Sequence, residues 1–411
     1  MRLFFYIREN FDCMRVFSLI IALFLLIYNT ESKAGPRLLS ENAEISLLTC
    51  SPGKELYSVF GHSAIRVNDP ASEMDWVFNY GTFDFDTPNF YLKFSSGQLN
   101  YILSVNHFSR FVQSYFREER SVYEQVLNLT ASEKQNLFNA LVENAKPENK
   151  FYRYDFFFDN CATRIRDMII NHLDGQIHFQ DTTVSDQSFR DYIHEYVNQK
   201  PWTSDGLDLL LGVRTDNIAS VRQQMFLPDY MMLYFGKATI SKDNTPRGLV
   251  KEMHQLLKFD NEISDIRGIT PDQLFWALLI ISVILFLYEI KRKKKPFMLV
   301  TRLLLCASGC IGVLFFYLWF LSLHSVTGQN FNLLWAMPTN LILAFLPLKI
   351  LSQRFFRILQ IVTLSLLIIN VLTLFFIPQY IPTFVLPFSL ILIMRFTHLV
   401  TFTTKNIKYR V

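Results

Sequence analysis

The C-terminal third of the chain most constrains its fold, because it consists of long apolar runs that water cannot accommodate. Five such runs cover residues 274–288, 303–323, 333–348, 358–377 and 381–394. A helix rises 1.5 Å per residue, so each run crosses, or nearly crosses, a hydrocarbon layer of about 30 Å. The sequence therefore predicts a transmembrane domain of about five helices over residues 271–411.

Basic residues alternate between the connections of these runs and set the orientation of the helices. Lys and Arg occur in 291–295, 349–357 and 405–410, whereas 324–331 and 378–381 contain neither. Basic connections stay on the cytoplasmic side. We therefore expect a multi-pass protein of a bacterial inner membrane, with the region before residue 271 in the periplasm and the C-terminus in the cytoplasm. Ionisable groups within the runs are few, and Arg395 is expected to snorkel to the interface, which disfavours a transporter.

The N-terminus has the pattern of a secretory signal. Arg15 precedes the apolar run 16–28, and Ser32-Lys33-Ala34 supplies a small-x-small cleavage site. We expect residues 1–34 to be a signal peptide, with Met14 as an alternative start. The other interpretation is an uncleaved anchor helix. Under both, residues 35–270 form an exported domain.

Charge and cysteine content exclude several function classes. The 40 Lys and Arg against 36 Asp and Glu leave a net charge of +4, which gives no reason to expect a nucleic-acid partner. The five cysteines form no C-x-x-C pair, so we expect neither a disulfide framework nor a metal site, and no cofactor. Only Cys50 and Cys161 fall in the exported domain.

The exported domain alternates strand and helix patterns, which predicts the α+β class. Residues 63–67 and 75–81 are expected to form an antiparallel hairpin, with further strands over 45–50, 99–103 and 122–129. A turn centred on Ala71 would place His62 opposite Asn79. Thr130 and Glu133 form a capping-box pattern that opens a helix reaching about Ala145.

Cys161 stands where a helix over 162–172 should begin, with Asn160 or Asp159 as the expected N-cap. A thiol at a helix N-terminus is favoured as thiolate, and nearby backbone N–H groups can stabilise an oxyanion. The alternatives are a small buried hydrophobe, or a disulfide with Cys50 in an oxidising compartment.

His62 is the expected partner of this thiol. It follows Gly61, which permits close approach of another backbone, and it lies at the start of the hairpin. The imidazole would accept the thiol proton, and the Asn79 amide would orient the ring.

Three further residues are candidates for contacts at this site. Glu55 and Ser58 precede His62 closely, and Glu55 is the rival orienter, although a solvated carboxylate is the simpler interpretation. Arg164 follows Cys161 on the same helix and would bind a phosphate or carboxylate, unless it pairs with Asp167.

Two long motifs carry a resemblance to a known family. They are TCSPGKELYSVFGHSAIRV at 49–67 and DNCATRIRD at 159–167, followed by MFLPDY at 225–230. With the helical tail, they resemble the Lnb-type periplasmic domain family of Bacteroidetes. Ala162 departs mildly from the pattern, since relatives are expected to have Thr there.

The resemblance implies a circularly permuted, NlpC-type papain-like fold in which the catalytic His62 precedes the catalytic Cys161. It also implies lipoprotein N-acyltransferase activity. A membrane phospholipid would donate a fatty acyl group to the α-amine of a lipoprotein's lipidated N-terminal cysteine. Asn79 rests on the hairpin argument alone.

Three other functions fit the same residues. A cell-wall peptidase or amidase would use the same Cys-His dyad with water as the acceptor, and a phospholipase or thioesterase would differ only in the acceptor. A non-catalytic sensor or scaffold would instead have Cys161 bonded to Cys50.

Overall fold

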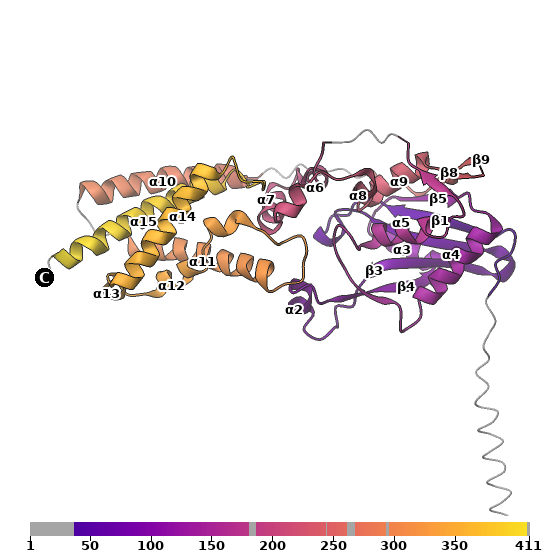
Figure 1. Ribbon diagram of the computed structural model, residues 1–411, viewed down its shortest axis with the longest axis horizontal. Coiled ribbons are helices and arrows are strands. Elements are labelled where there is room, and N and C mark those ends of the chain that lie inside the picture. The colour runs from indigo at the N-terminus through magenta and orange to yellow at the C-terminus, as the bar shows by residue number, and fades with distance from the viewer. Residues whose placement is uncertain (1–36, 181–185, 244, 261–267, 293–295, 409–411) are drawn as a thin grey trace, which may run out of the picture. The chain divides into compact units, whose positions relative to one another are not determined.

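A computed structural model of the chain describes residues 37–180, 186–243, 245–260, 268–292 and 296–408. The expected signal peptide, with its alternative start at Met14, lies outside these residues. The chain divides after Leu39, and residues 40–411 form the unit described below (Figure 1).

A seven-stranded sheet forms the centre of the N-terminal domain, with strand order β10-β5-β1-β2-β3-β4-β6 and antiparallel neighbours throughout. Its strands are β1 (Glu44–Cys50), β2 (His62–Asp69), β3 (Met74–Thr82), β4 (Asn100–His107), β5 (Val122–Leu127), β6 (Phe151–Arg153) and β10 (Val250–Leu257). The predicted strands are all present. A smaller sheet contains β7 (Gln176–His178), β8 (Thr239–Lys242) and β9 (Thr245–Gly248).

The β2–β3 hairpin is present, but its register differs from the prediction by two residues. The observed ladder pairs Asn68 with Asp75 and Ile65 with Phe78. The pairing follows a four-residue turn, in which a 3₁₀ turn, η2 (Pro70–Ser72), is followed by Glu73 in the left-handed conformation with φ 50°. A shift of two residues keeps every side chain on its original face of the sheet.

Several helices pack against the strands of the large sheet. Helix α5 (Cys161–Ile170) packs on β2 and β3, α9 (Pro228–Lys237) packs on β1 and β10, and α3 (Phe108–Arg117) packs on β3 and β4. The expected capping box opens α4 (Ala131–Asn144), where Thr130 and Glu133 each bond the other's backbone N–H. The remaining elements of this domain are η1 (Leu56–Ser58), α2 (Phe90–Ser95), α6 (Phe189–Val197), α7 (Pro201–Leu210), η3 (Val213–Asp216) and α8 (Val221–Gln224).

Among the described residues, four C-terminal helices are long and apolar enough to cross a membrane. They are α10 (Pro271–Lys291), α11 (Met298–Phe320), α14 (Arg354–Thr373) and α15 (Val385–Lys408). The run 333–348 instead contains the end of η4 (Phe331–Leu334) and a short α12 (Thr339–Phe345), before α13 (Leu348–Leu351). Pro338 and Pro347 bracket α12 and interrupt the helical hydrogen bonding. The expectation of about five spans stays a prediction.

Arg395 does not snorkel, contrary to the prediction. Its side chain is buried on α15, and Nη1 bonds Glu289 of α10 at 2.9 and 3.0 Å. Glu289 is also buried and lies 2.9 Å from Nδ1 of His398. The partner of Arg395 lies about a hundred residues away on another helix. The local sequence around Arg395 therefore could not predict this pair.

Both turns that lack basic residues contact the sheet domain. In the first, His324 Nε2 lies 2.8 Å from the Phe94 carbonyl oxygen, and Ser325 donates a short hydrogen bond to Asp155. In the second, Gln379 Nε2 donates to the Leu211 carbonyl oxygen at 3.1 Å. These two turns therefore lie on the same side of the helical bundle as the sheet domain.

Candidate active site

Cys161 is the first residue of α5, and Asn160 fixes that position. The Asn160 Oδ1 accepts the Thr163 N–H at 2.9 Å, and its Nδ2 donates to the carbonyl oxygens of Phe156 and Phe226, both at 2.8 Å. Asn160 is buried. Its amide is thus fully used in tying α5 to two aromatic segments, which makes it a positioning residue for the thiol.

His62 lies at the start of β2, and Asn79 holds its imidazole by a hydrogen bond. Nε2 of His62 and Oδ1 of Asn79 are 2.6 Å apart. The register shift does not separate them, because residues two positions apart on a strand share a face. An amide oxygen only accepts, so Nε2 carries the proton and Nδ1 is the nitrogen left to accept one from a thiol.

His62 and Cys161 shift each other's pKa in opposite directions. Burial alone raises the pKa of the Cys161 thiol, but the charge and hydrogen bond of His62, with the backbone N–H groups of Ser63 and Ala162, lower it below its ordinary value. Burial alone lowers the pKa of His62, yet Cys161 and Asn79 together raise it. The pair is therefore poised to form thiolate and imidazolium.

Two residues at the site were not expected from the sequence. Gly81 has φ +84°, and a Cβ there would lie 3.4 Å from Cys161 Cβ and 3.8 Å from both His62 Cε1 and Tyr154 Cε2. The β3–β4 register shifts between Asn79 and Thr82, which marks a bulge at this point. A glycine inside a strand was a usable signal for the bulge. Tyr154 lay in an aromatic segment without any signal of its own.

Glu55 and Ser58 are not brought against the imidazole by any hydrogen bond that the described residues show. Glu55 is exposed, and its carbonyl oxygen accepts the Ser58 hydroxyl at 3.0 Å. Ser58 is buried and lies against Gly53, since a Cβ placed on Gly53 would lie 2.3 Å from the Ser58 Oγ. Both residues shape the turn that precedes β2.

Arg164 points its guanidinium at Asp159 rather than at Asp167. Its Nε lies 2.5 Å and its Nη2 2.8 Å from the two Asp159 carboxylate oxygens, and its Cζ lies 3.6 Å from the centroid of the Tyr152 ring. Asp167 is paired with Arg166 and Arg222 instead. The Arg164 cation is therefore already neutralised by a carboxylate.

Cys50 and Cys161 are both free thiols. Burial raises the pKa of Cys50 to about 12, so this thiol stays protonated at neutral pH. Only Cys161 of the two has the electrostatic setting of a nucleophile.

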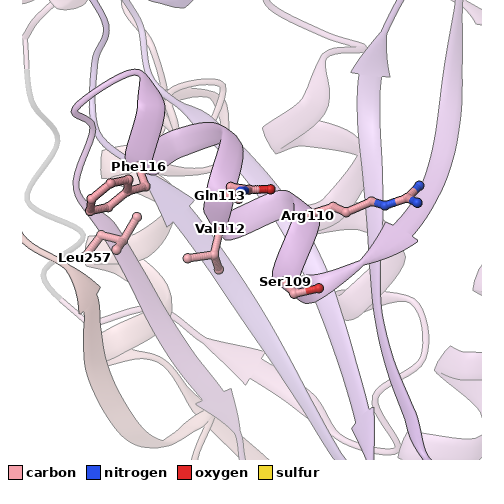
Figure 2. A pocket seen from close by; sticks show the side chains of 6 residues that line it. All are labelled: Ser109, Arg110, Val112, Gln113, Phe116 and Leu257. Atoms are coloured by element: carbon pink, nitrogen blue, oxygen red, sulfur yellow. The ribbon is translucent and has the colours of Figure 1, made fainter.

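Two cavities among the described residues lie away from Cys161 and His62. The larger, about 410 Å³, is lined by five residues of α3 and by Leu257 of β10, with Phe116 and Leu257 side by side (Figure 2). The other, about 310 Å³, lies beside Arg164, Tyr80 and His172. Neither is lined by Cys161 or His62.

Comparison with known families identifies both halves of the chain. The Lnb N-terminal periplasmic domain matches residues 37–199, and the Lnb transmembrane domain matches residues 262–407. The chain belongs to the Lnb family. This confirms the resemblance based on the two motifs, and the Lnb protein is a membrane protein with a periplasmic N-terminal domain. No curated protein and no solved structure matches it.

Proposed function

We propose that this Lnb protein is a thiol-dependent acyltransferase. It transfers a fatty acyl group from a membrane phospholipid to the N-terminal amine of a lipoprotein through a thioester on Cys161. The observation that carries the proposal is the His62–Asn79 hydrogen bond of 2.6 Å beside a thiol whose pKa His62 lowers, in a chain with membrane-spanning helices.

In the first half-reaction, His62 takes the Cys161 proton and the thiolate attacks the ester carbonyl carbon. Backbone N–H groups at the start of α5 stabilise the tetrahedral oxyanion, a contribution of about 3 kcal/mol per donor. The carbon–oxygen ester bond then breaks, and His62 returns its proton to the departing lysophospholipid alcohol.

In the second half-reaction, the lipoprotein amine attacks the thioester. His62 accepts the amine proton, the carbon–sulfur bond breaks, and His62 returns the proton to the Cys161 thiolate, with an N-acyl lipoprotein as product. Both substrates are anchored in the bilayer, so a membrane-anchored enzyme meets them at high effective concentration.

The finer architecture and the location belong to the same proposal. The His62-before-Cys161 order supports a circularly permuted papain-like domain of the NlpC type. Contacts of residues 324–331 and 378–381 with the sheet domain support a periplasmic position for these turns. With the basic connections on the other side, they favour an inner-membrane location and a cytoplasmic C-terminus.

The test uses the full chain in phospholipid vesicles with a peptide that bears a diacylglyceryl N-terminal cysteine. Mass spectrometry should find one added acyl chain on the peptide amine and an equal amount of lysophospholipid. Cys161→Ser should abolish both products while the protein still accumulates in the membrane. Product from Cys161→Ser would remove the nucleophile from the proposal.

A cell-wall peptidase or amidase remains the second candidate, because the same dyad would cleave an amide if water resolved the acyl-enzyme. The separating experiment offers peptidoglycan stem peptides and the lipid substrates to the same preparation. Cleavage of the stem peptides without any acylated peptide would assign the site to the peptidase class, and free fatty acid without acylated peptide would indicate a phospholipase.

A further inference from the structure

The segment between β3 and β4 exposes an unusual concentration of apolar side chains. Four large side chains of this segment are exposed, including Tyr91 at 81% and Leu92 at 63%; the set is Phe85, Tyr91, Leu92 and Phe94. They lie on α2 and in the turn before it. A cluster of this kind on an exposed surface marks a site of contact with a partner or a membrane.

The segment between β3 and β4 is hydrogen-bonded to the end of a membrane-spanning helix. The Leu323 N–H, just after α11, donates to the Ser96 carbonyl oxygen at 2.8 Å. Gly97, with φ +71°, lies so close that a Cβ would be 3.2 Å from the His324 nitrogen. Phe320 and Leu321 at the end of α11 are exposed as well. The apolar surface of α11 therefore continues onto α2.

A row of aromatic rings leads from this segment toward the nucleophile. Ring centroids are 5.0 Å apart for Phe85 and Phe83, 5.3 Å for Phe83 and Tyr101, and 4.4 Å for Tyr101 and Tyr154. Tyr154 then meets Gly81 beside Cys161. The row connects an exposed apolar surface with a largely buried thiol.

We propose that α2 and the turn before it dip into the bilayer, and that a phospholipid acyl chain reaches Cys161 along this aromatic row. Lys93, the only charged residue of α2, would meet the lipid phosphate. The membrane contact stands on the exposed surface and its continuity with α11. The delivery of an acyl chain rests in addition on the proposed function.

The experiment uses the full chain in vesicles that contain a phospholipid with a photoreactive diazirine in its acyl chain. After irradiation, mass spectrometry should locate adducts within residues 83–95. The double variant Tyr91→Glu with Leu92→Glu should lower this labelling at least fivefold. It should also lower the rate of Cys161 acylation by the phospholipid at least tenfold relative to the rate with a water-soluble short-chain ester.

Phe116→Glu is the matched control, because Phe116 is a 59% exposed aromatic on α3 of the same domain. It should change neither the labelling nor the ratio of the two acylation rates. Absence of adducts within 83–95, or an equal fall with Phe116→Glu, would overturn the inference. Adducts there without Cys161 acylation by either ester would keep the membrane contact and remove the proposed function.

Discussion

Two pairs of ionisable groups, one in each half of this Lnb protein, are held in opposite ways. In the sheet domain, the buried Cys161 lies beside the half-buried His62, whose ring is hydrogen-bonded to the neutral Asn79 amide. In the helical bundle, Glu289 and Arg395 are buried as a pair of opposite charges, with His398 on the same carboxylate. The first pair has no carboxylate hydrogen-bonded to its ring, whereas the second joins a guanidinium to a carboxylate.

We interpret the first pair as the reactive one of the proposed function and the second as structural. Among the described residues no carboxylate is hydrogen-bonded to the His62 ring, so a proton can move between His62 and Cys161, as the proposed acyl transfer requires. The Glu289–Arg395 pair cannot lose a partner without leaving a charge in an apolar region, so it holds α10 against α15. Four variants measure how far this contrast extends.

The largest effect is expected in the bundle, from Glu289→Gln. The variant leaves the Arg395 guanidinium buried without a carboxylate, and its Nε and Nη2 already have no hydrogen-bond partner. Loss of one partner of a buried pair costs about 3–5 kcal/mol. Thermal unfolding of the full chain in detergent should show a marked fall in Tm.

Two matched variants test the reason for this fall. Asp272→Asn removes a half-buried carboxylate from the first turn of the same helix, where the amide can still accept the Thr383 hydroxyl, and should change Tm little. Combining Glu289→Gln with Arg395→Met should restore most of the lost stability, because neither charge remains. An unchanged Tm for Glu289→Gln alone would show that the pair does not hold the helices together.

The next effect is expected at the site, from Asn79→Ala. The imidazole loses the acceptor that fixes its tautomer and its direction, so the Cys161 thiolate forms less often in the productive geometry. We expect a fall of about 10- to 100-fold in the acyl-transfer rate, with Tm nearly unchanged. Ser104→Ala is the control, since its hydroxyl bonds only the Asn79 backbone oxygen. Full activity of Asn79→Ala would exclude Asn79 as the orienting residue.

Local patterns predicted more of the sheet domain than of the bundle, and the reason is the range of the contacts. The N-cap of α5 and the hairpin depend on residues close in sequence. The place of Cys161 after a capping residue, and the shared face of His62 and Asn79, could therefore be expected from the sequence. The hairpin register could not, since it depends on the left-handed conformation of Glu73 in the turn. The Glu289–Arg395 pair joins separate helices and leaves no local signal.

A third, smaller effect concerns the pH dependence of Cys161 alkylation. His62 lowers the pKa of the Cys161 thiol against the effect of burial, so the thiolate persists to a lower pH than for an ordinary thiol. His62→Ala leaves only burial and the backbone donors. The alkylation inflection should move to higher pH, and alkylation at pH 7 should slow about tenfold.

Peptide mapping by mass spectrometry identifies the alkylated thiol in that experiment. Cys50 is the internal control, because its pKa of about 12 keeps it unreactive across the neutral range in both proteins. An inflection that stays in place after His62→Ala would mean that the imidazole does not act on the thiol.

The smallest effect is expected where the two halves meet, from Ser325→Ala. Ser325 donates a hydrogen bond to Asp155, whose other carboxylate oxygen still accepts the Phe157 and Phe158 N–H groups at 3.1 Å. The turn before Cys161 therefore persists, and stability should fall by about 1 kcal/mol. Alkylation of Cys161 should not change, but acylation by phospholipid should slow if this contact keeps the site at the bilayer. Ser352→Ala is the matched control, because its hydroxyl bonds the Leu348 carbonyl oxygen within the bundle. Equal acylation rates for the two variants would mean that the halves work without this link.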